Sequence, residues 1–133
     1  MSTVKYILYV LIISFFSYTL MNKVLIYDSF LLNILKTGLF SDFQVYVLSV
    51  SAIALEAIAV LLLILKKRTG LIFSICMMLI FTIYIIILYV IGRYEVCGCG
   101  GIMNGLNFES HFLVNAFIIL IMMYLLKEKN EKE

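Results

Sequence analysis

Four long runs of apolar residues dominate the pattern of hydrophobic and polar positions along the chain. A bilayer core about 30 Å thick is crossed by about 20 helical residues, because each residue advances a helix by about 1.5 Å. The second and third runs reach this length alone, and the outer two reach it if Lys5 and Lys127 extend to the headgroups. The runs cover about Tyr6–Met21, Phe43–Leu65, Gly70–Gly92 and Phe112–Leu126. The pattern therefore predicts four transmembrane helices, at about residues 4–22, 43–65, 70–92 and 110–127.

The composition also indicates that the protein lies in a lipid bilayer. The 133 residues are 65% hydrophobic and only 14% charged, whereas soluble domains contain roughly 25% charged residues. A soluble domain of about 150 residues buries only about 70% of the surface of its unfolded chain, so the excess apolar surface must face lipid. We expect an all-α integral membrane four-helix bundle that forms a single transmembrane domain over residues 1–133. Membrane lipid is then a partner, and the absence of a basic patch interleaved with aromatic residues argues against nucleic acid.

The positions of Lys and Arg predict the orientation. Cytoplasmic loops carry the excess of basic residues. With both termini in the cytoplasm, seven basic residues lie inside, namely Lys5, Lys66, Lys67, Arg68, Lys127, Lys129 and Lys132, and three lie outside, namely Lys23, Lys36 and Arg93. We therefore expect cytoplasmic termini and extracytoplasmic segments at 22–42 and 93–110. No Ala-x-Ala type of cleavage site follows the first run, so we expect it to stay in the protein as a helix rather than to be removed as a signal.

A short helix is predicted within the first extracytoplasmic segment. Leu31, Ile34, Leu35 and Leu39 recur there at helical spacing. Asp28 or Ser29 could cap the start of this helix, and Gly38 could end it. We expect an amphipathic interfacial helix that rests on the bundle as a lid.

The second extracytoplasmic segment contains most of the candidate chemistry. Cys97 and Cys99 are separated by a single glycine, and four of the seven glycines of the chain lie in this segment, at Gly98, Gly100, Gly101 and Gly105. Glycine permits positive φ and close backbone approach, so these residues allow a sharp turn around the two thiols. An extracytoplasmic location also permits a disulfide.

Three roles for the thiol pair stay open. A Cys97–Cys99 disulfide would close a small, strained ring, and strained exposed disulfides are typically the labile or catalytic ones. The same disulfide could instead be a static staple of the loop. The third role is a metal site, in which the two thiolates would bind zinc with His111 and Glu109, or cuprous copper with Met103.

Helix residues near the thiol pair are candidates for supporting roles. His111 and Asn115 are four residues apart at the outer end of the last helix, so they share one face. His111 could lower a thiol pKa or move its proton, or both side chains could orient the glycine-rich loop through its carbonyl groups. Cys76 lies 21 residues before Cys97, near the opposite membrane face, where we expect inert packing.

Glu56 is the only ionisable residue well inside a predicted span. A charge at that depth costs about 2.5–3.5 kcal/mol on insertion scales, so we expect Glu56 to face the bundle interior, either protonated or paired. Counting residues places it about 14 Å from the cytoplasmic end and about 12 Å below His111 and Asn115. The same count places Ser14, Ser17 and Thr82 level with Glu56. It could handle protons, bind a ligand or form a structural hydrogen bond between helices.

The whole chain resembles the methylamine-utilisation protein MauE family, a branch of the DoxX-like four-helix membrane proteins. The resemblance lies in the helix layout, in Glu56 within Leu55-Glu56-Ala57, and most specifically in Cys97-Gly98-Cys99-Gly100-Gly101 followed by His111 and Asn115. The family usually has an aromatic residue after the second cysteine and a tryptophan before the histidine. This chain has Gly100 at the first position and no tryptophan.

The resemblance implies a function at the outer face of a bacterial inner membrane. Members of this family are expected to work with thioredoxin-like proteins in forming or transferring disulfides while exported proteins mature. Cys97, Cys99 and His111 would be the catalytic residues, and Gly98, Gly100, Gly101 and Asn115 would orient the loop. No cofactor is assigned with certainty, and a quinone is the candidate electron acceptor. The alternatives are a non-enzymatic subunit of a membrane complex with a structural disulfide, or a membrane protein that binds a metal or small molecule.

Overall fold

The computed structural model describes residues 3–36, 38–92 and 107–131, with the side chains of residues 128–131 left out. All regular structure in these ranges is α-helical. In chain order the helices are α1 (Thr3–Leu25), α2 (Tyr27–Lys36), α3 (Asp42–Leu65), α4 (Lys67–Val90) and α5 (Phe108–Glu131). Four of them, α1, α3, α4 and the Phe108–Lys127 part of α5, are long and apolar enough to cross a membrane. For the described residues, the prediction of an all-helical fold with four candidate membrane spans is confirmed.

The outer surface of these helices is apolar. Only 22–33% of the residues in each span are buried within the protein, and the rest present mainly Leu, Ile and Val side chains outward. Exposure on this scale is unfavourable in water, because burial of apolar surface is worth about 25 cal/mol per Å². It is the expected surface of a bundle that lies in lipid.

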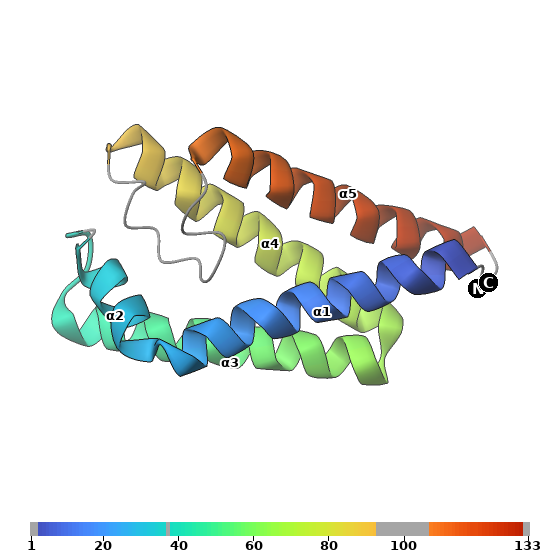
Figure 1. Ribbon diagram of the computed structural model, residues 1–133, viewed down its shortest axis with the longest axis horizontal. Helices are drawn as coiled ribbons and strands as arrows, with labels where there is room; N and C mark the ends of the chain where they lie inside the picture. Colours follow the sequence, from blue (N-terminus) through green and yellow to red (C-terminus); the bar gives the residue numbers. More distant parts are fainter. Residues whose placement is uncertain (1–2, 37, 93–106, 132–133) are drawn as a thin grey trace.

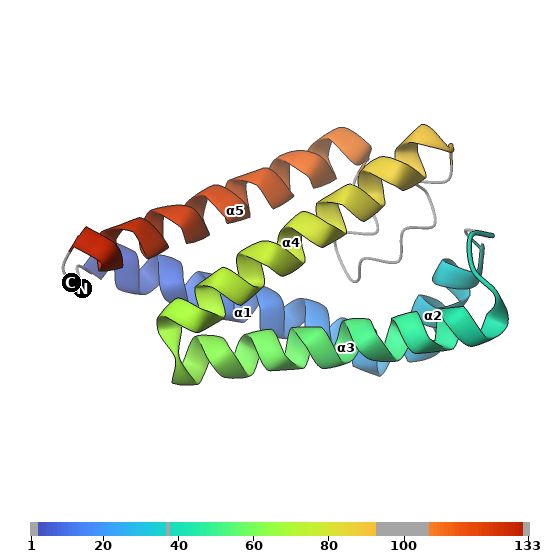
Figure 2. The ribbon, with the colours of Figure 1, turned by 180° about the vertical axis from the view of Figure 1, so that it is seen from behind.

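The helices form a bundle that is tighter at one end than at the other (Figure 1). Helix α1 packs along α3, α3 along α4, and α4 along α5. Figures 1 and 2 show that the α1/α3 pair and the α4/α5 pair diverge toward the end that carries α2. Both chain termini and the α3–α4 turn lie at the opposite end, which we call the termini end. The basic residues Lys5, Lys66, Lys67, Arg68 and Lys127 therefore lie toward one end of the bundle, while the side of the membrane that they occupy stays a prediction.

Each membrane-length helix buries a stripe of residues spaced three, four or seven apart. The buried positions are Tyr9, Ile12, Phe16, Thr19 and Lys23 in α1, Val45, Ser49, Glu56, Ala59 and Leu63 in α3, and His111, Asn115, Ile118, Met122 and Leu125 in α5; α4 buries Leu71, Ser74, Met78, Ile85 and Leu88 with its neighbours. A repeat close to 3.5 residues is the pattern by which helices pack at small crossing angles. At the termini end these stripes form the apolar core.

The termini end also contains the closest approach between two helices. A single non-helical residue, Lys66, connects α3 to α4. Gly70 then lies directly against the α3 backbone, where an added Cβ atom would come within 2.5 Å of the Leu63 nitrogen. Only glycine fits at this position without displacing a backbone segment.

Helix α2 rests on α3 as a lid, through a face that differs partly from the predicted one. Phe30 and Ile34 are buried against Val45, whereas Leu35 and Leu39 are exposed. Gly38 has φ +70° and donates its N–H to the Leu35 carbonyl oxygen at 3.1 Å. This is the predicted glycine stop, since a left-handed glycine commonly ends a helix.

The predicted cap of α2 by Asp28 or Ser29 is wrong. The helix already begins at Tyr27, with only Ile26 between it and the end of α1. The Ile26 N–H donates to Asn22 O at 3.0 Å, and the Phe30 N–H donates to Ile26 O at 3.1 Å. Because this chain of backbone hydrogen bonds runs from α1 into α2, no separate side-chain cap is required.

Two other helix ends are set by residues whose capping role the sequence analysis did not recognise. Ser41 and Gln44 form a reciprocal capping box at the start of α3. The Asn107 side chain accepts a hydrogen bond from the Ser110 N–H at 2.9 Å, so α5 begins at Phe108 rather than at about residue 110. Gly92, with φ +77°, follows the end of α4.

We predict that Gly70→Ala destabilises the bundle by about 1–3 kcal/mol, the usual cost of overpacking a filled site. The added methyl group must displace the α3 backbone at Leu63, because no flexible side chain is in the way. The free energy of unfolding, measured by denaturant titration in detergent micelles, checks this value. Ala57→Ser, which adds one atom at an exposed position of α3, is the control and should change stability by less than about 0.5 kcal/mol. Equal stability of the two variants would contradict the close approach.

Candidate functional site

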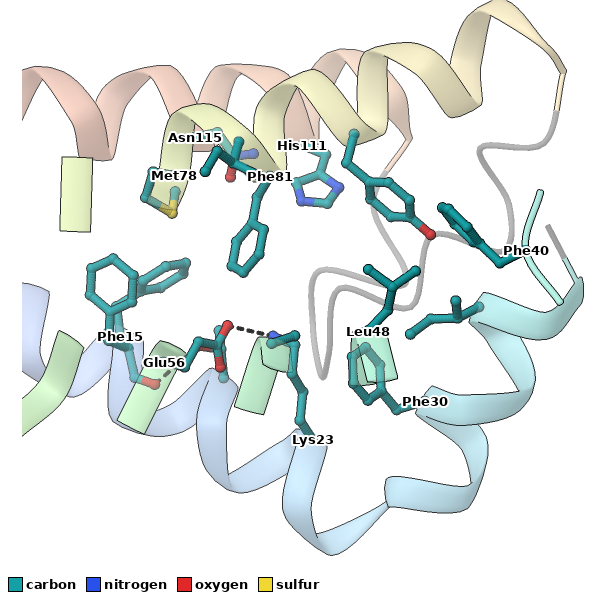
Figure 3. A pocket seen from close by; sticks show the side chains of 16 residues that line it. Phe15, Lys23, Phe30, Phe40, Leu48, Glu56, Met78, Phe81, His111 and Asn115 are labelled. Carbon is teal, nitrogen blue, oxygen red and sulfur yellow. Dashed lines mark hydrogen bonds and ion pairs between the residues drawn. The ribbon is translucent and has the colours of Figure 1, made fainter. Parts of the chain in front are cut away.

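A cavity of about 190 Å³ lies between the two helix pairs, toward the end that carries α2 (Figure 3). All five helices or their adjoining residues contribute to its wall. The lining is mostly aromatic and aliphatic, with a few polar side chains: Phe15, Phe16, Thr19, Lys23, Phe30, Ile34, Phe40, Leu48, Ala52, Glu56, Met78, Ile80, Phe81, Tyr84, His111 and Asn115. The cavity thus lies where the buried stripes of α1, α3 and α5 contain polar residues.

An ion pair between α1 and α3 lies in the cavity wall. Lys23 Nζ donates to Glu56 Oε1 at 2.6 Å. The two residues are only 4% and 1% exposed, respectively. Lys23 Nζ also lies 5.8 Å from the ring centroid of Phe30 and 5.6 Å from that of Phe81, within the range of cation–π attraction. The ammonium group is therefore held between a carboxylate and two aromatic rings.

This arrangement corrects the sequence analysis of Lys23. The residue was assigned to the extracytoplasmic segment, but it lies in the last turn of α1 and is buried. Its neighbours in the buried stripe, Phe16 and Thr19, precede it by seven and four residues. That spacing was visible in the sequence and could have identified Lys23 as inward-facing.

Glu56 faces the bundle interior, and its partner is not among the residues that the depth count placed level with it. Ser14 is exposed, and Thr82 donates its hydroxyl hydrogen to the Met78 carbonyl oxygen at 2.7 Å. The count assumed that all helices end in one outer plane. Instead α1 ends deeper than the start of α3, and α2 covers the remaining part of α3 (Figure 1). The Lys23 ammonium therefore reaches Glu56.

The second oxygen of Glu56 is a buried acceptor. Within the described ranges, Glu56 Oε2 has no hydrogen-bond partner. Buried polar atoms without a partner are rare, because leaving one costs about 1–3 kcal/mol, and more if it is charged. This atom therefore marks a place where a hydrogen-bond donor would be stabilised.

His111 and Asn115 are buried in the wall that α5 contributes to the cavity. Asn115 Nδ2 donates to Thr82 Oγ1 on α4 at 3.4 Å. The ring of Phe108 on α5 stacks on the ring of Tyr89 on α4 at a centroid distance of 4.2 Å. Thr82 lies seven residues from Tyr89, and Asn115 lies seven residues from Phe108, so both are at a similar depth in the bundle. The predicted separation of about 12 Å in depth between Thr82 and Asn115 is therefore wrong. His111 and Asn115 line the same cavity as Glu56.

The proposed thiol pair lies outside the part of the chain that the structure describes. This applies to Cys97, Cys99, Gly98, Gly100 and Gly101, and also to Met103 and Gly105. The end of α4 and the start of α5, which precede and follow this segment in the chain, lie at the α2 end of the bundle (Figure 1). The expected contacts of the thiols with His111 and Asn115 stay predictions.

Two further expectations concern other possible ligands. Within residues 3–36, 38–92 and 107–131, no three His, Cys, Asp or Glu residues lie close enough together to hold a metal ion, so the metal hypothesis depends on Cys97 and Cys99. Cys76 is exposed on the outer surface of α4, and it does not pack in the core as expected. The preceding residue, Ile75, contacts the core. Consecutive residues of a helix point in different directions, and Cys76 points outward.

The fold and site define a multi-pass α-helical membrane protein with a paired charge and a mostly apolar cavity inside its bundle. Comparison with protein families gives a match to the methylamine utilisation protein MauE over residues 1–127. The chain therefore belongs to the MauE family, in agreement with the resemblance noted from its sequence. No curated protein and no solved structure matches it.

We predict that Lys23 and Glu56 are strongly coupled in stability. Lys23→Met or Glu56→Leu alone should cost about 3–5 kcal/mol, because each leaves an unpaired buried charge. The double variant should regain most of that loss, since it removes both charges. Denaturant titration of the four proteins in micelles gives the coupling energy. Lys36→Met, at the exposed end of α2, is the control, and additive losses in the double variant would mean that the two side chains act independently.

Proposed function

We propose that this MauE-family protein is a thiol–disulfide exchange component of the bacterial inner membrane. Its Cys97-Gly98-Cys99 pair would act on the extracytoplasmic side, with a thioredoxin-like partner, in the maturation of exported proteins. The observation that carries the proposal is the combination of family membership over residues 1–127 with a Cys-Gly-Cys sequence in a glycine-rich segment. The segment is joined at both ends to the same end of the bundle.

The chemistry requires only the two sulfur atoms and a partner dithiol. A partner thiolate attacks one sulfur of the Cys97–Cys99 disulfide, forms a mixed disulfide and releases the other sulfur as a thiolate. The second partner thiolate then attacks the mixed disulfide. The partner leaves oxidised by two electrons, and Cys97 and Cys99 are left reduced and take up the two protons. The reverse sequence transfers the electrons in the other direction.

The described residues suggest how the bundle would support this exchange. The first turns of α5, with His111 and Asn115 buried, are anchored to α4 by the Tyr89–Phe108 stack and the Thr82–Asn115 hydrogen bond. A segment held at a rigid attachment loses less entropy when it adopts a reactive geometry. In this proposal His111 assists proton transfer at the thiols and Asn115 orients the segment.

We predict that the single variants Cys97→Ser and Cys99→Ser trap a mixed disulfide with the partner. In these variants the remaining thiolate attacks the disulfide of an oxidised partner, forms the mixed disulfide and releases one partner sulfur as a thiolate. The second cysteine, which would normally attack this mixed disulfide and release the reduced partner, is missing, so the intermediate accumulates. A band that disappears on reduction, seen by electrophoresis of membranes treated with an alkylating agent, checks this. Cys76→Ser is the control and should neither trap a partner nor lose activity. Normal maturation of exported proteins in cells that carry Cys97→Ser/Cys99→Ser would favour a structural subunit instead.

The sidedness of the thiols has its own test. After gentle reduction, a membrane-impermeant maleimide added from outside should label Cys97 or Cys99 in a Cys76→Ser background. The same reagent should label a cysteine introduced at Lys67 only after the membrane is opened, because Lys67 begins α4 at the opposite end of the bundle. The reverse pattern would overturn the proposed orientation.

A further inference from the structure

The unpartnered oxygen of Glu56 selects the polar group that the cavity would bind. Glu56 is 1% exposed, and its Oε2 atom lacks a partner among the described residues while its other oxygen accepts from Lys23. A carboxylate oxygen only accepts hydrogen bonds. A ligand that satisfies it must therefore carry a donor such as O–H or N–H.

The charge of the site favours a neutral donor. Lys23 and Glu56 compensate each other within 2.6 Å, so the pair has no net charge to offer a ligand. A cationic ligand at Glu56 would meet the neighbouring ammonium group, and an anionic ligand would meet the carboxylate. Either ion would also lose its hydration inside an apolar wall, which costs several kcal/mol. A hydroxyl group avoids these costs and still donates.

The remaining wall favours an apolar ring. Phe15 of α1 and Phe81 of α4 lie on either side of the cavity near Glu56 (Figure 3), and Phe16 also lines it. Aromatic side chains gain attraction from stacking or edge contacts with another ring. A cavity of about 150 Å³ lined by apolar side chains binds benzene in another protein. At about 190 Å³, this cavity has room for one six-membered ring and a small substituent.

The rim of the cavity indicates where the ligand comes from. Leu48 on α3 and Ile80 on α4 line the cavity and are also 39% and 62% exposed. Both lie within membrane-length helices. The cavity wall is thus continuous with the outer apolar surface of the bundle, so a molecule dissolved in the bilayer can reach it without crossing water.

We propose that this cavity binds a neutral, lipid-soluble molecule whose six-membered ring carries a hydroxyl group, that is, a phenol or a hydroquinone. The hydroxyl donates to Glu56 Oε2, and the ring lies among the phenylalanine side chains. The residues that carry this proposal all lie in the described ranges, and the proposal does not depend on the thiol chemistry.

A matched pair of probes tests the hydroxyl. The purified protein in detergent micelles is titrated with 4-propylphenol and with 4-propylanisole, its methyl ether, which has a similar shape but no donor. Binding is followed by ligand-observed NMR, with empty micelles as the blank. We expect the phenol to bind at least about tenfold more tightly, the ratio given by one hydrogen bond to a charged group.

Three variants connect the probes to the cavity. In Lys23→Met/Glu56→Leu the preference for the phenol should disappear, while the ring still binds. Ala52→Leu fills the cavity from α3 and should weaken both probes at least about fivefold. Ala54→Leu, an equal change at an exposed position of the same helix that does not line the cavity, should leave both affinities unchanged.

Several results would overturn the proposal. Equal affinity of the two probes for the unmodified protein would mean that the cavity accepts any apolar molecule, such as a lipid chain. Absence of binding, or binding that Ala52→Leu and Ala54→Leu affect equally, would mean that the probes do not occupy it. Repeating the titrations with Cys97→Ser/Cys99→Ser separates this site from the thiol proposal, because we expect unchanged binding in a protein that has no thiol exchange.

Discussion

The ion pair between Lys23 and Glu56 is the constraint on which the arrangement of this bundle depends. Each charge alone would cost about 2.5–3.5 kcal/mol at the centre of a bilayer. A contact of 2.6 Å between them removes much of this cost, but only when the last turn of α1 lies against the middle of α3. Sliding α1 by one turn would separate the charges by about 5 Å. The pair therefore selects the relative position of the two helices, although buried ion pairs in general add little net stability.

This position of α1 determines the architecture of the α2 end. Because α1 ends beside the inner part of α3, the first part of α3 extends beyond it (Figure 2). Helix α2 covers that extension with Phe30 and Ile34. The α1/α3 pair and the α4/α5 pair diverge at this end, and α2 covers α3 there. The cavity lies between the two pairs. The termini end, with Gly70 against the α3 backbone and an apolar core, supplies the packing that holds the pairs together.

The sequence was sufficient for the features that depend on local composition. Four spans follow from the lengths of the apolar runs, and the end of α2 follows from Gly38. Features that depend on relative helix position were missed. The first apolar run ends at Met21, which predicts a loop position for Lys23, whereas this residue continues the buried stripe of Phe16 and Thr19. A residue count also misplaces Asn115 in depth, because it assumes that the helix ends are coplanar. The positions of Cys97 and Cys99 relative to His111 also depend on more than local composition, so composition alone does not predict them.

The reduction potential of the Cys97–Cys99 pair tests most directly whether this membrane protein exchanges disulfides. It can be measured in membranes or micelles by equilibration with defined thiol and disulfide buffers, followed by alkylation and mass analysis, in a Cys76→Ser background. Proteins that exchange disulfides have potentials between about −120 and −270 mV, whereas structural disulfides typically lie below about −300 mV. The account predicts a value within the first range. A value well below about −300 mV would contradict it and indicate a static staple.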